Sequence, residues 1–411
     1  MHIEYITGYA GTGKSTALLK QLTTIAGKDK DDTIVLCPTH KAAHRLLPKI
    51  PFGIEIKTIH SLLGWIPAIN ENAEKIEHID IVAKTDRKIE EYNTFIIDEG
   101  GMMSEEMFME LVAKIEDARN FDTDGIKIYV YLDPYQLLPV KGRQIQLDEE
   151  FTTKLTTQHR AESPDVVALF TKFVEFLEGT NTKDLKIDFS ENVKKVSTTE
   201  AVQLFDITKD RLLAYTNEVV GWYNKEISVY NGIQSFVGQH VQLGSNPDLV
   251  YVEDMIDKSD VVLSDVITWY LDNNMLLQNS NISAKYMELE FSTLLKIDGV
   301  EFAKVAINGT TKIVPVVLGI YNAYSLTKQI KAAAIKDKKN YKFIYALNKA
   351  YTMDYKFAST VHKAQGSEFD AVFVDVNDIK KSILPNYYDT YARLMYVALS
   401  RAKKKVYIIQ D

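Results

Sequence analysis

A glycine-rich segment near the amino terminus has the residue types and spacing of a phosphate-binding loop. It reads GYAGTGKS (residues 8–15) and fills every required position of the pattern G-x-x-x-x-G-K-S. Glycines let backbone amides turn towards an anion, and a helix that begins there presents its positive end to the same anion. We therefore expect Lys14 to contact the β- and γ-phosphates of a nucleotide and Ser15 to hold Mg²⁺. A chance strand-turn-helix junction is the competing interpretation.

Two further polar groups follow apolar segments. Asp98 and Glu99 come directly after the apolar residues Thr94–Ile97, and Gln136 lies in the segment LDPYQLLPV (residues 132–140). Asp98 is a candidate Mg²⁺ ligand, and Glu99 is a candidate base that positions an attacking water. Gln136 could bond both a phosphate oxygen and that water, because an amide both donates and accepts. Alone, either segment is equally compatible with a solvated turn.

Alternating strands and helices must position these groups. Apolar strands are predicted at HIEYIT, IVLC, TFIID and IKIYVYLD, with helices after Gly13 and from about His40 and Ser104. This order predicts a parallel sheet covered by helices, so the polar groups would meet at the carboxyl edge of the strands. A second α/β set begins at LLAYTN (212–217) and resumes at AVFVDV (371–376) and KVYIIQ (405–410). Between the two parts of this set, HVQL, MELEF, VEFAKVAI and TKIVPVVL are interpreted as short β patterns of an inserted β-rich subdomain.

Composition narrows the class of protein. The 411 residues contain 48 Lys plus Arg and 56 Asp plus Glu, a net charge of −8, which excludes a uniformly basic coat but allows a local basic track. Seven lysines against one acid between residues 325 and 350 could form such a track or a solvated helix face. A single cysteine, Cys37, and no long apolar run indicate a cytoplasmic protein.

The ordered motifs together resemble a known family. They are GYAGTGKS, CPTHKAA, TIHSLLG, IIDEGGM, LDPYQLLPV, TQHRA, LLAYTN, STVHKAQGSEFD and YVALSRAKKKV. This series, from residue 8 to residue 406, is similar to the motif series of superfamily 1 (SF1B) DNA helicases, nearest to the phage Dda and bacterial RecD branch, whose members move 5′ to 3′. The family's adenine-reading glutamine precedes the first strand, and only seven residues precede Gly8 here. The resemblance therefore assigns no residue to base recognition.

The resemblance implies an α/β fold with two RecA-like P-loop NTPase domains, each with a parallel sheet, and inserted accessory subdomains. The first motor domain would span residues 1–155, with an insertion at 66–92 in the place of the strand-separating pin. The second would combine residues 156–229 and 351–411. Residues 230–350 would form the β-rich insertion, which would include a basic helix.

The resemblance also implies the nucleotide-site residues. ATP and Mg²⁺ would bind at Gly11, Thr12, Gly13, Lys14, Ser15, Thr16, Gly366 and Glu368, with Mg²⁺ on Ser15 and Asp98. The catalytic set would be Lys14, Asp98, Glu99, Gln136, Arg160 and Arg401. Two arginines that close on the γ-phosphate would stabilise charge in the transition state.

Single-stranded DNA is the implied partner, together with junctions between single- and double-stranded DNA. Its backbone would contact Thr39, His40, Thr58, His60, Thr360, His362 and Lys363. Hydroxyl, imidazole and ammonium groups suit phosphate contacts that do not depend on sequence. Each histidine is equally a candidate for a purely structural role. Replication, recombination or repair proteins are candidate partners, and we expect a monomer.

The expected activity is therefore ATP-dependent unwinding of DNA, in which hydrolysis is coupled to closure of two RecA-like domains. The alternative is a translocase that displaces proteins or aids recombination without separating strands. A nucleic-acid-binding module with a decayed ATPase is a third possibility. The complete set of Lys14, Asp98, Glu99, Gln136 and Arg401 argues against decay.

Overall fold

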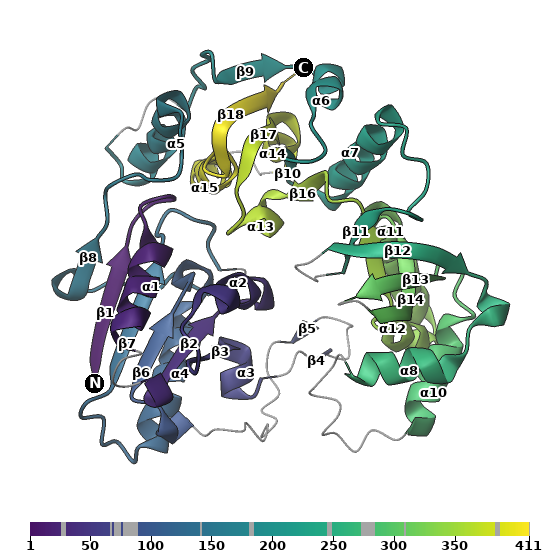
Figure 1. Cartoon of the computed structure of the whole chain (residues 1–411), viewed down its shortest axis with the longest axis horizontal. Coiled ribbons are helices and arrows are strands. Elements are labelled where there is room, and N and C mark those ends of the chain that lie inside the picture. Colours follow the sequence, from purple (N-terminus) through teal and green to yellow (C-terminus); the bar gives the residue numbers. More distant parts are fainter. Residues whose placement is uncertain are drawn as a thin grey trace. The chain divides into compact units, whose positions relative to one another are not determined.

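The computed structural model describes residues 1–25, 30–65, 68–69, 75–76, 89–139, 142–180, 185–244, 249–272, 284–307, 310–382 and 387–410 (Figure 1). The chain forms two compact units. The first unit comprises Met1–Lys195, Ala364–Val372 and Ile383–Tyr407, and the second comprises Val196–Lys363, Phe373–Ser382 and Ile408–Asp411. The four-part division into motor and accessory domains stays a prediction.

A six-stranded parallel sheet organises the first unit, with the order β3-β2-β6-β7-β1-β8. Its strands, in chain order, are β1 (His2–Thr7), β2 (Thr33–Cys37), β3 (Glu55–Thr58), β6 (Thr94–Ile97), β7 (Lys127–Leu132) and β8 (Thr152–Lys154). The four apolar segments predicted as strands are β1, β2, β6 and β7. Because all strands run the same way, the residues that follow β1, β6 and β7 meet at one edge.

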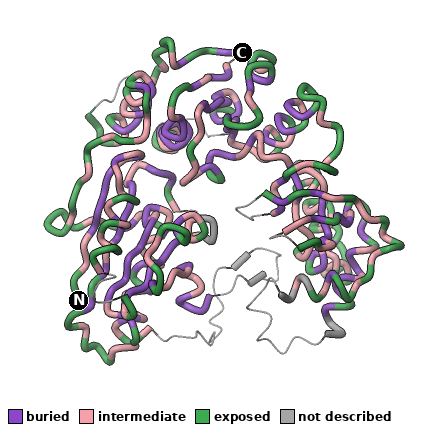
Figure 2. The backbone as a smooth tube through the Cα atoms, in the orientation of Figure 1, coloured by how far each residue is buried: buried purple, intermediate pink, exposed green. Residues whose placement is uncertain are grey.

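Both faces of this sheet are covered, because alternate residues of its strands are apolar on both sides. Ile34 and Leu36 of β2 pack in a cluster with α3 (Ile59–Leu63) and α4 (Glu105–Ala118). Val35 and Cys37 pack on the other face with α1 (Lys14–Ile25) and α2 (His40–Leu46). The buried segments in Figure 2 follow these strands. Near-continuous apolar strands are typical of a sheet buried on both faces.

Local capping explains where three of these helices begin. The side chains of Thr39, Thr58 and Ser104 accept hydrogen bonds from the backbone amides of Ala42, Ser61 and Met107, and each satisfies one free amide of its helix. Gly64, with φ 71°, ends α3 in the left-handed conformation. Thr39 follows the end of β2 by two residues, and Thr58 is the last residue of the paired strand β3, so both caps lie at the same edge of the sheet.

A second sheet has the order β16-β10-β17-β18-β9. Its strands are β9 (Val193–Val196), β10 (Arg211–Ala214), β16 (Ala358–Thr360), β17 (Phe369–Asp375) and β18 (Ala402–Ile409). The helices in this part of the chain are α5 (Pro164–Leu177), α6 (Thr198–Leu204), α7 (Asn217–Tyr230), α13 (Val361–Ala364), α14 (Val376–Ser382) and α15 (Tyr388–Leu399). Helix α15 is buried along almost its whole second half, from Leu394 to Leu399. The two-sheet α/β architecture confirms the predicted fold class.

A closed five-stranded barrel forms the accessory part of the second unit. Its strands are β11 (His240–Leu243), β12 (Leu249–Ile256), β13 (Glu301–Ile307), β14 (Thr310–Leu318) and β15 (Tyr351–Asp354). Neighbouring strands are antiparallel except for the parallel pair β14 and β15. Valine, alanine, leucine and methionine side chains fill the interior, so closure of the sheet and apolar packing hold the barrel together.

Helices cover one side of the barrel. They are α8 (Leu263–Asp272), α10 (Ala284–Leu294), α11 (Ile320–Lys336) and α12 (Tyr341–Leu347). The prediction that MELEF (residues 287–291) is a strand is wrong, because this segment lies in α10. Met287, Phe291 and Leu294 are buried on one helical face while Leu289 is 62% exposed, which is a helical and not an alternating pattern.

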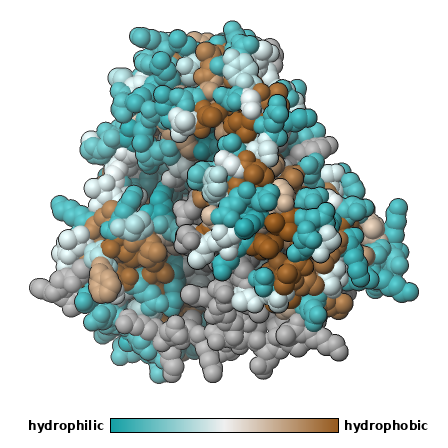
Figure 3. All heavy atoms as spheres, turned by 45° about the vertical axis from the view of Figure 1, so that its right-hand side comes forward, coloured by the Kyte–Doolittle hydropathy of each residue, from teal (hydrophilic) through white to brown (hydrophobic). Residues whose placement is uncertain are grey.

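The surface of the second unit carries the predicted lysine-rich segment. Residues 325–350 form most of α11, the 3₁₀ turn Lys338–Asn340 and α12. Lys328, Lys331 and Lys342 are among its exposed residues. Figure 3 shows apolar patches among hydrophilic side chains on the face that it presents.

The structure describes only part of the predicted pin insertion. In the predicted pin insertion (residues 66–92), only the short antiparallel pair β4 (Ala68–Ile69) and β5 (Lys75–Ile76) and residues 89–92 are described, so its remaining residues lie outside the described part of the chain. Trp65, directly before this insertion, is buried in the core of the first unit. Among the described residues, no helix has both the length and the apolar composition needed to cross a membrane.

Candidate functional site

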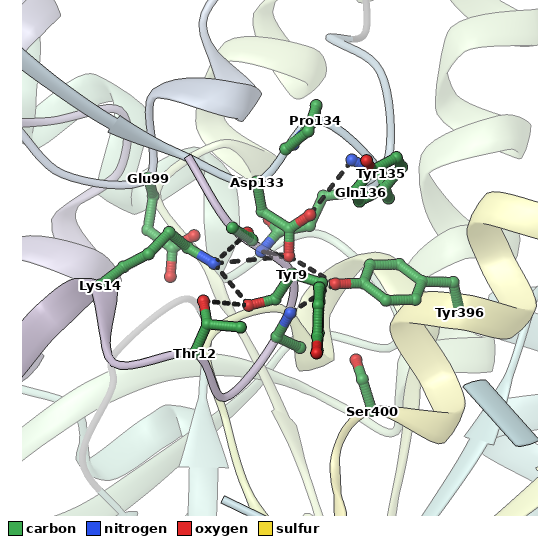
Figure 4. A network of polar contacts seen from close by, with 12 residues as sticks. Tyr9, Thr12, Lys14, Glu99, Asp133, Pro134, Tyr135, Gln136, Tyr396 and Ser400 are labelled. Atoms are coloured by element: carbon green, nitrogen blue, oxygen red, sulfur yellow. Dashed lines mark hydrogen bonds and ion pairs between the residues drawn. The ribbon is translucent and has the colours of Figure 1, made fainter. Parts of the chain in front are cut away.

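The loop between β1 and α1 has the backbone shape of a phosphate-binding loop. Gly11 and Gly13 adopt φ angles of 84° and 83°, which glycine reaches without a Cβ penalty. The buried hydroxyl of Thr12 donates to the Tyr9 carbonyl at 2.9 Å. The Lys14 ammonium donates to the carbonyls of Gly8 and Tyr9 at 2.6 and 2.9 Å (Figure 4). The loop therefore engages its own lysine.

Asp133, at the end of β7, is the centre of the buried network. Its Oδ2 lies 3.6 Å from Lys14 Nζ and accepts a 2.6 Å hydrogen bond from the Tyr396 hydroxyl (Figure 4). The same hydroxyl accepts a 2.5 Å bond from the Ala10 amide in the loop. Burial and the neighbouring Asp133 raise the pKa of Tyr396 well above its ordinary value. The network ties the phosphate-binding loop, β7 and α15 together.

Gln136 belongs to the same network. Its Nε2 lies 3.4 Å from Asp133 Oδ2, and its Oε1 lies 3.5 Å from Gln365 Nε2. Arg393 of α15 donates to the carbonyls of Pro134 and Gln136, both at 2.7 Å. The Gln136 side chain, which is predicted to contact the terminal phosphate, is thus buried beside the loop. Arg393 of α15 holds the backbone of this segment.

Asp98 and Glu99 follow β6 at the same sheet edge, as predicted. Burial raises the pKa of Asp98 to about 6, and the adjacent Glu99 adds to the effect. Burial also raises the pKa of Glu99, but the charges of Arg45, Lys14 and Arg401 outweigh it and hold that pKa below its ordinary value. Glu99 adopts φ 53° and ψ 36°, a left-handed conformation that is uncommon for a residue with a side chain. Glu99 thus combines an uncommon backbone conformation with a carboxylate that is stabilised by three positive charges.

The two glycines after Glu99 are required because β7 and the residue after it pack closely against them. A Cβ on Gly100 would lie 2.7 Å from Val130 Cγ1, and one on Gly101 would lie 2.9 Å from the Asp133 carbonyl oxygen. Both contacts are with β7 or the residue after it. Small residues here let the turn after β6 pack directly on the end of β7, which brings Glu99 and Asp133 to one site.

Arg45 of α2 is a further cation at this edge. Its Nη2 lies 3.0 Å from Glu99 Oε1 and 3.7 Å from Asp98 Oδ2, and its Nη1 donates to the Gly366 carbonyl. Glu99 and Asp98 together raise the pKa of Arg45 above its ordinary value, although burial acts in the opposite direction. Arg45 therefore holds both acidic groups and the predicted nucleotide-site residue Gly366.

The residues present fit a Mg²⁺ ion. Asp98 Oδ2 is buried and accepts no hydrogen bond from the residues that the structure describes. A buried carboxylate oxygen without a donor is an unusual cost in a folded protein, and a hard cation would satisfy it. Ser15 lies exposed in the first turn of α1, and no hydrogen bond joins it to Asp98 in the described structure. Thr16 is exposed in the same turn.

The two predicted arginine fingers are both engaged by protein groups. Arg160 Nε lies 2.9 Å from Glu368 Oε1, so the structure brings these two predicted residues together. Arg401 is 1% exposed and donates to the carbonyl of Val397 at 3.0 Å and to the Ser400 hydroxyl at 2.9 Å. Burial and the nearby Arg160 lower the pKa of Arg401 to about 10. Arg401 thus lies within electrostatic reach of both Arg160 and Glu99.

The predicted DNA residues of the first unit lie at the neighbouring strand ends. Thr39 and Thr58 use their hydroxyls as caps of α2 and α3. The His60 ring lies edge-on to Trp65, with centroids 5.8 Å apart. His40 is the first residue of α2, and its side chain lies outside the described part of the chain. The structure groups these residues but also gives two of them structural roles.

In the second unit, two of the predicted DNA residues lie in α13, and the third lies directly before it. Thr360 ends β16, and its hydroxyl accepts from the Lys363 amide at 3.3 Å. Burial lowers the pKa values of His362 and Lys363, and Asp354 opposes the change at Lys363. The His362 ring lies edge-on to Tyr215, with centroids 5.8 Å apart. Tyr215 itself is held by the Asp378 carboxylate, which accepts from its amide at 2.7 Å.

Several residues of this site were not assigned from the sequence. They are Arg45, Asp133, Arg393, Tyr396 and Tyr215. Asp133 carried a usable signal, since it is an acid directly after an apolar strand. Arg45 and Tyr396 carried none, because one lies at the end of a helix and the other inside an apolar run. Their partners are distant in sequence, and only the fold brings them together.

Family models match both ends of the chain. A model described as an AAA domain matches residues 1–183, and one described as a UvrD-like helicase C-terminal domain matches residues 355–409. Among solved structures, the Pif1 helicase from Candida albicans superimposes with a TM-score of 0.50 at 16% identity, over 100% of this chain and 92% of that one. This likeness shows the fold.

Two curated relatives have no assigned function. An uncharacterized protein of Methanocaldococcus jannaschii is 25% identical, over 99% of this chain, and the chain spans only 36% of that relative's length. The uncharacterized protein R530 of Acanthamoeba polyphaga mimivirus is 24% identical, over 92% of this chain and 90% of the relative.

The matched domain models, the fold and the order of motifs agree. The fold confirms the predicted fold class, and the two matched domain models support the predicted resemblance to superfamily 1 helicases, a family of ATP-hydrolysing DNA helicases.

Proposed function

We propose that this chain unwinds DNA by moving 5′ to 3′ along a single strand with ATP as its fuel. The observation that carries the proposal is that the charges of Lys14, in the phosphate-binding loop, and Arg401, after α15, both act on the carboxylate of Glu99. These two cations come from distant segments of the chain. A site of this kind suits a triphosphate and the charge that develops when its terminal phosphoryl group is transferred.

The roles of the residues follow from their present partners. Lys14 would exchange the carbonyls of Gly8 and Tyr9 for phosphate oxygens, and Glu99 would orient the attacking water. Gln136 would contact both the water and the terminal phosphate. Mg²⁺ held near Asp98 and Ser15 would neutralise part of the phosphate charge.

The arginines would couple chemistry to motion. Arg160 would leave Glu368, and Arg401 would turn part of its guanidinium, when the γ-phosphate offers a stronger anionic partner. Loss of that partner after hydrolysis would reverse both changes. We infer that closure and reopening of this kind alternate the grip of the two DNA-contact groups, Thr39, His40, Thr58 and His60 in one and Thr360, His362 and Lys363 in the other.

Unwinding of two tailed duplexes tests this proposal. The full chain should open a duplex with a 5′ single-stranded tail in the presence of ATP and Mg²⁺, and should leave a 3′-tailed duplex closed. The Glu99→Gln variant, which keeps the shape of the side chain but not its charge, should open neither. Opening only the 3′-tailed duplex would overturn the polarity. DNA-stimulated hydrolysis without opening of either duplex would favour the translocase.

The cellular role remains a prediction. Participation in replication, recombination or repair, a monomeric state, a cytoplasmic location and action in a phage-infected cell are expectations from the sequence.

A further inference from the structure

Arg45 occupies a position that none of the predicted roles explains. About one third of its side chain is exposed, and the rest lies between the two acidic residues and the loop that contains Gly366. A guanidinium group has a planar fork of donors and can bind a carboxylate and a carbonyl at the same time. Here the two ends of the fork hold Glu99 and Gly366 together.

Arg45 also competes with a metal ion for the same carboxylates. Its Nη2 lies 3.7 Å from Asp98 Oδ2, the buried oxygen that accepts no hydrogen bond from the described residues. A divalent cation beside that oxygen would be repelled by a guanidinium at this distance. The arrangement in which Arg45 engages Glu99 therefore disfavours the arrangement in which Mg²⁺ and a water are positioned for hydrolysis.

Arg45 is close along the chain to residues that are predicted to contact DNA. It lies in the last turn of α2, six residues after Thr39, which is roughly 9 Å along a helix axis. Its other partner, Gly366, follows Lys363 by three residues in the chain. A shift of either DNA-contact segment would thus be transmitted to the guanidinium through one short helix or one short loop.

We propose that Arg45 is the positioning residue through which bound DNA controls hydrolysis. Without DNA, its guanidinium holds Glu99 and restricts access of Mg²⁺ to Asp98. DNA bound at α2 and at α13 moves Arg45 away, which frees both carboxylates. This inference rests on the proposed function and assigns it a mechanism of activation by DNA.

Substitution of Arg45 tests the proposal in the full chain. The Arg45→Gln variant should hydrolyse ATP about tenfold faster than the natural protein when DNA is absent, which corresponds to about 1.4 kcal/mol of restraint removed. Its rate with saturating single-stranded DNA should be unchanged, so the stimulation ratio should fall. Arg45→Lys should lie between the two, because an ammonium cannot hold Glu99 and Gly366 with a planar fork. His44→Gln, at an exposed neighbour on the same helix, is the matched control and should leave the ratio unchanged.

Binding provides a second readout that does not depend on turnover. The affinity for a fluorescent ADP should rise about tenfold in Arg45→Gln when Mg²⁺ is present and DNA is absent. In EDTA the affinity should not change. Thermal unfolding of each variant establishes that it is folded.

Each outcome decides the matter. An equal loss of rate with and without DNA, or a Mg²⁺-dependent affinity that does not rise, would overturn the proposal. If the natural protein itself showed no stimulation by DNA, the proposed function would fail, whereas the comparison of ADP binding in Mg²⁺ and EDTA would still test the competition between Arg45 and the metal.

Discussion

The predicted nucleotide-binding edge of the first sheet and the interior of the barrel are both shielded from water, but they are built from opposite kinds of side chain. Asp98, Asp133 and Arg401 are at most 3% exposed at the edge. In the barrel, Val252, Val305 and their neighbours are equally buried and wholly apolar. Buried polar groups must each find a partner, whereas apolar groups need only volume and shape.

This difference separates site from scaffold. At the edge, every contact specifies an orientation, so loss of one atom should change binding or chemistry. In the barrel, contacts are interchangeable, so loss of volume should reduce stability and leave chemistry intact. The following predictions test that separation.

Loss of the Lys14 ammonium should have the largest effect. Lys14→Ala removes the cation that faces the loop carbonyls and Asp133, so we expect at least a thousandfold loss of ATPase rate, about 4 kcal/mol of transition-state stabilisation. Steady-state ATPase and thermal unfolding are the measurements. Lys20→Ala, at an exposed position of the same helix, is the control and should retain the rate. Near-normal hydrolysis by Lys14→Ala would contradict the assignment of the edge as the site.

Loss of volume in the barrel should have the next largest effect, on stability alone. Val305→Ala removes two methyl groups from a fully buried position and should lower the free energy of unfolding by about 2 kcal/mol. Chemical denaturation measures this change. Lys304→Ala, next to it on β13 and exposed, should change stability little. A large fall in the ATPase rate of folded Val305→Ala would show that the barrel is more than a scaffold.

Removal of one hydroxyl at the edge should have the smallest effect but should act on both properties. Tyr396→Phe removes the 2.6 Å hydrogen bond to Asp133 Oδ2 and the hydroxyl that accepts from the Ala10 amide. We expect a loss of about 1 to 2 kcal/mol in stability, because both groups are buried, and about tenfold weaker ATP binding. Denaturation and nucleotide titration test the two effects. Tyr388→Phe, at an exposed residue of α15, is the control, and unchanged ATP affinity in Tyr396→Phe would remove the network from the site.

The elements of the first unit could be predicted because their signals are local. The strands β1, β2, β6 and β7 are apolar runs, and Thr39, Thr58 and Ser104 are helix caps that lie next to the helices they begin. The failure at α10 has a local cause as well. Met287 and Phe291 fit both a helical and an alternating pattern, and only the exposure of Leu289 decides between them.

The site could be predicted in its motifs but not in its connections. Lys14, Asp98 and Glu99 come after strands in recognisable motifs, so their residue types and positions predict a role in nucleotide binding or hydrolysis. The partners of Asp133 and Glu99 could not be found in this way, since Tyr396 and Arg45 lie 263 and 54 positions away from them. Such pairings depend on how helices cross the sheet edge, which no local pattern records.

The sole thiol of the chain lies behind the predicted catalytic edge of the first sheet. Cys37 ends β2 and is fully buried, and burial together with the charges of Asp98 and Glu99 raises its pKa. A buried, protonated thiol reacts slowly, so modification requires the sheet edge to open. Cys37 is therefore an intrinsic probe of local opening, and the rate at which thiol reagents label it would report how often the catalytic edge exposes its interior, without any engineered label.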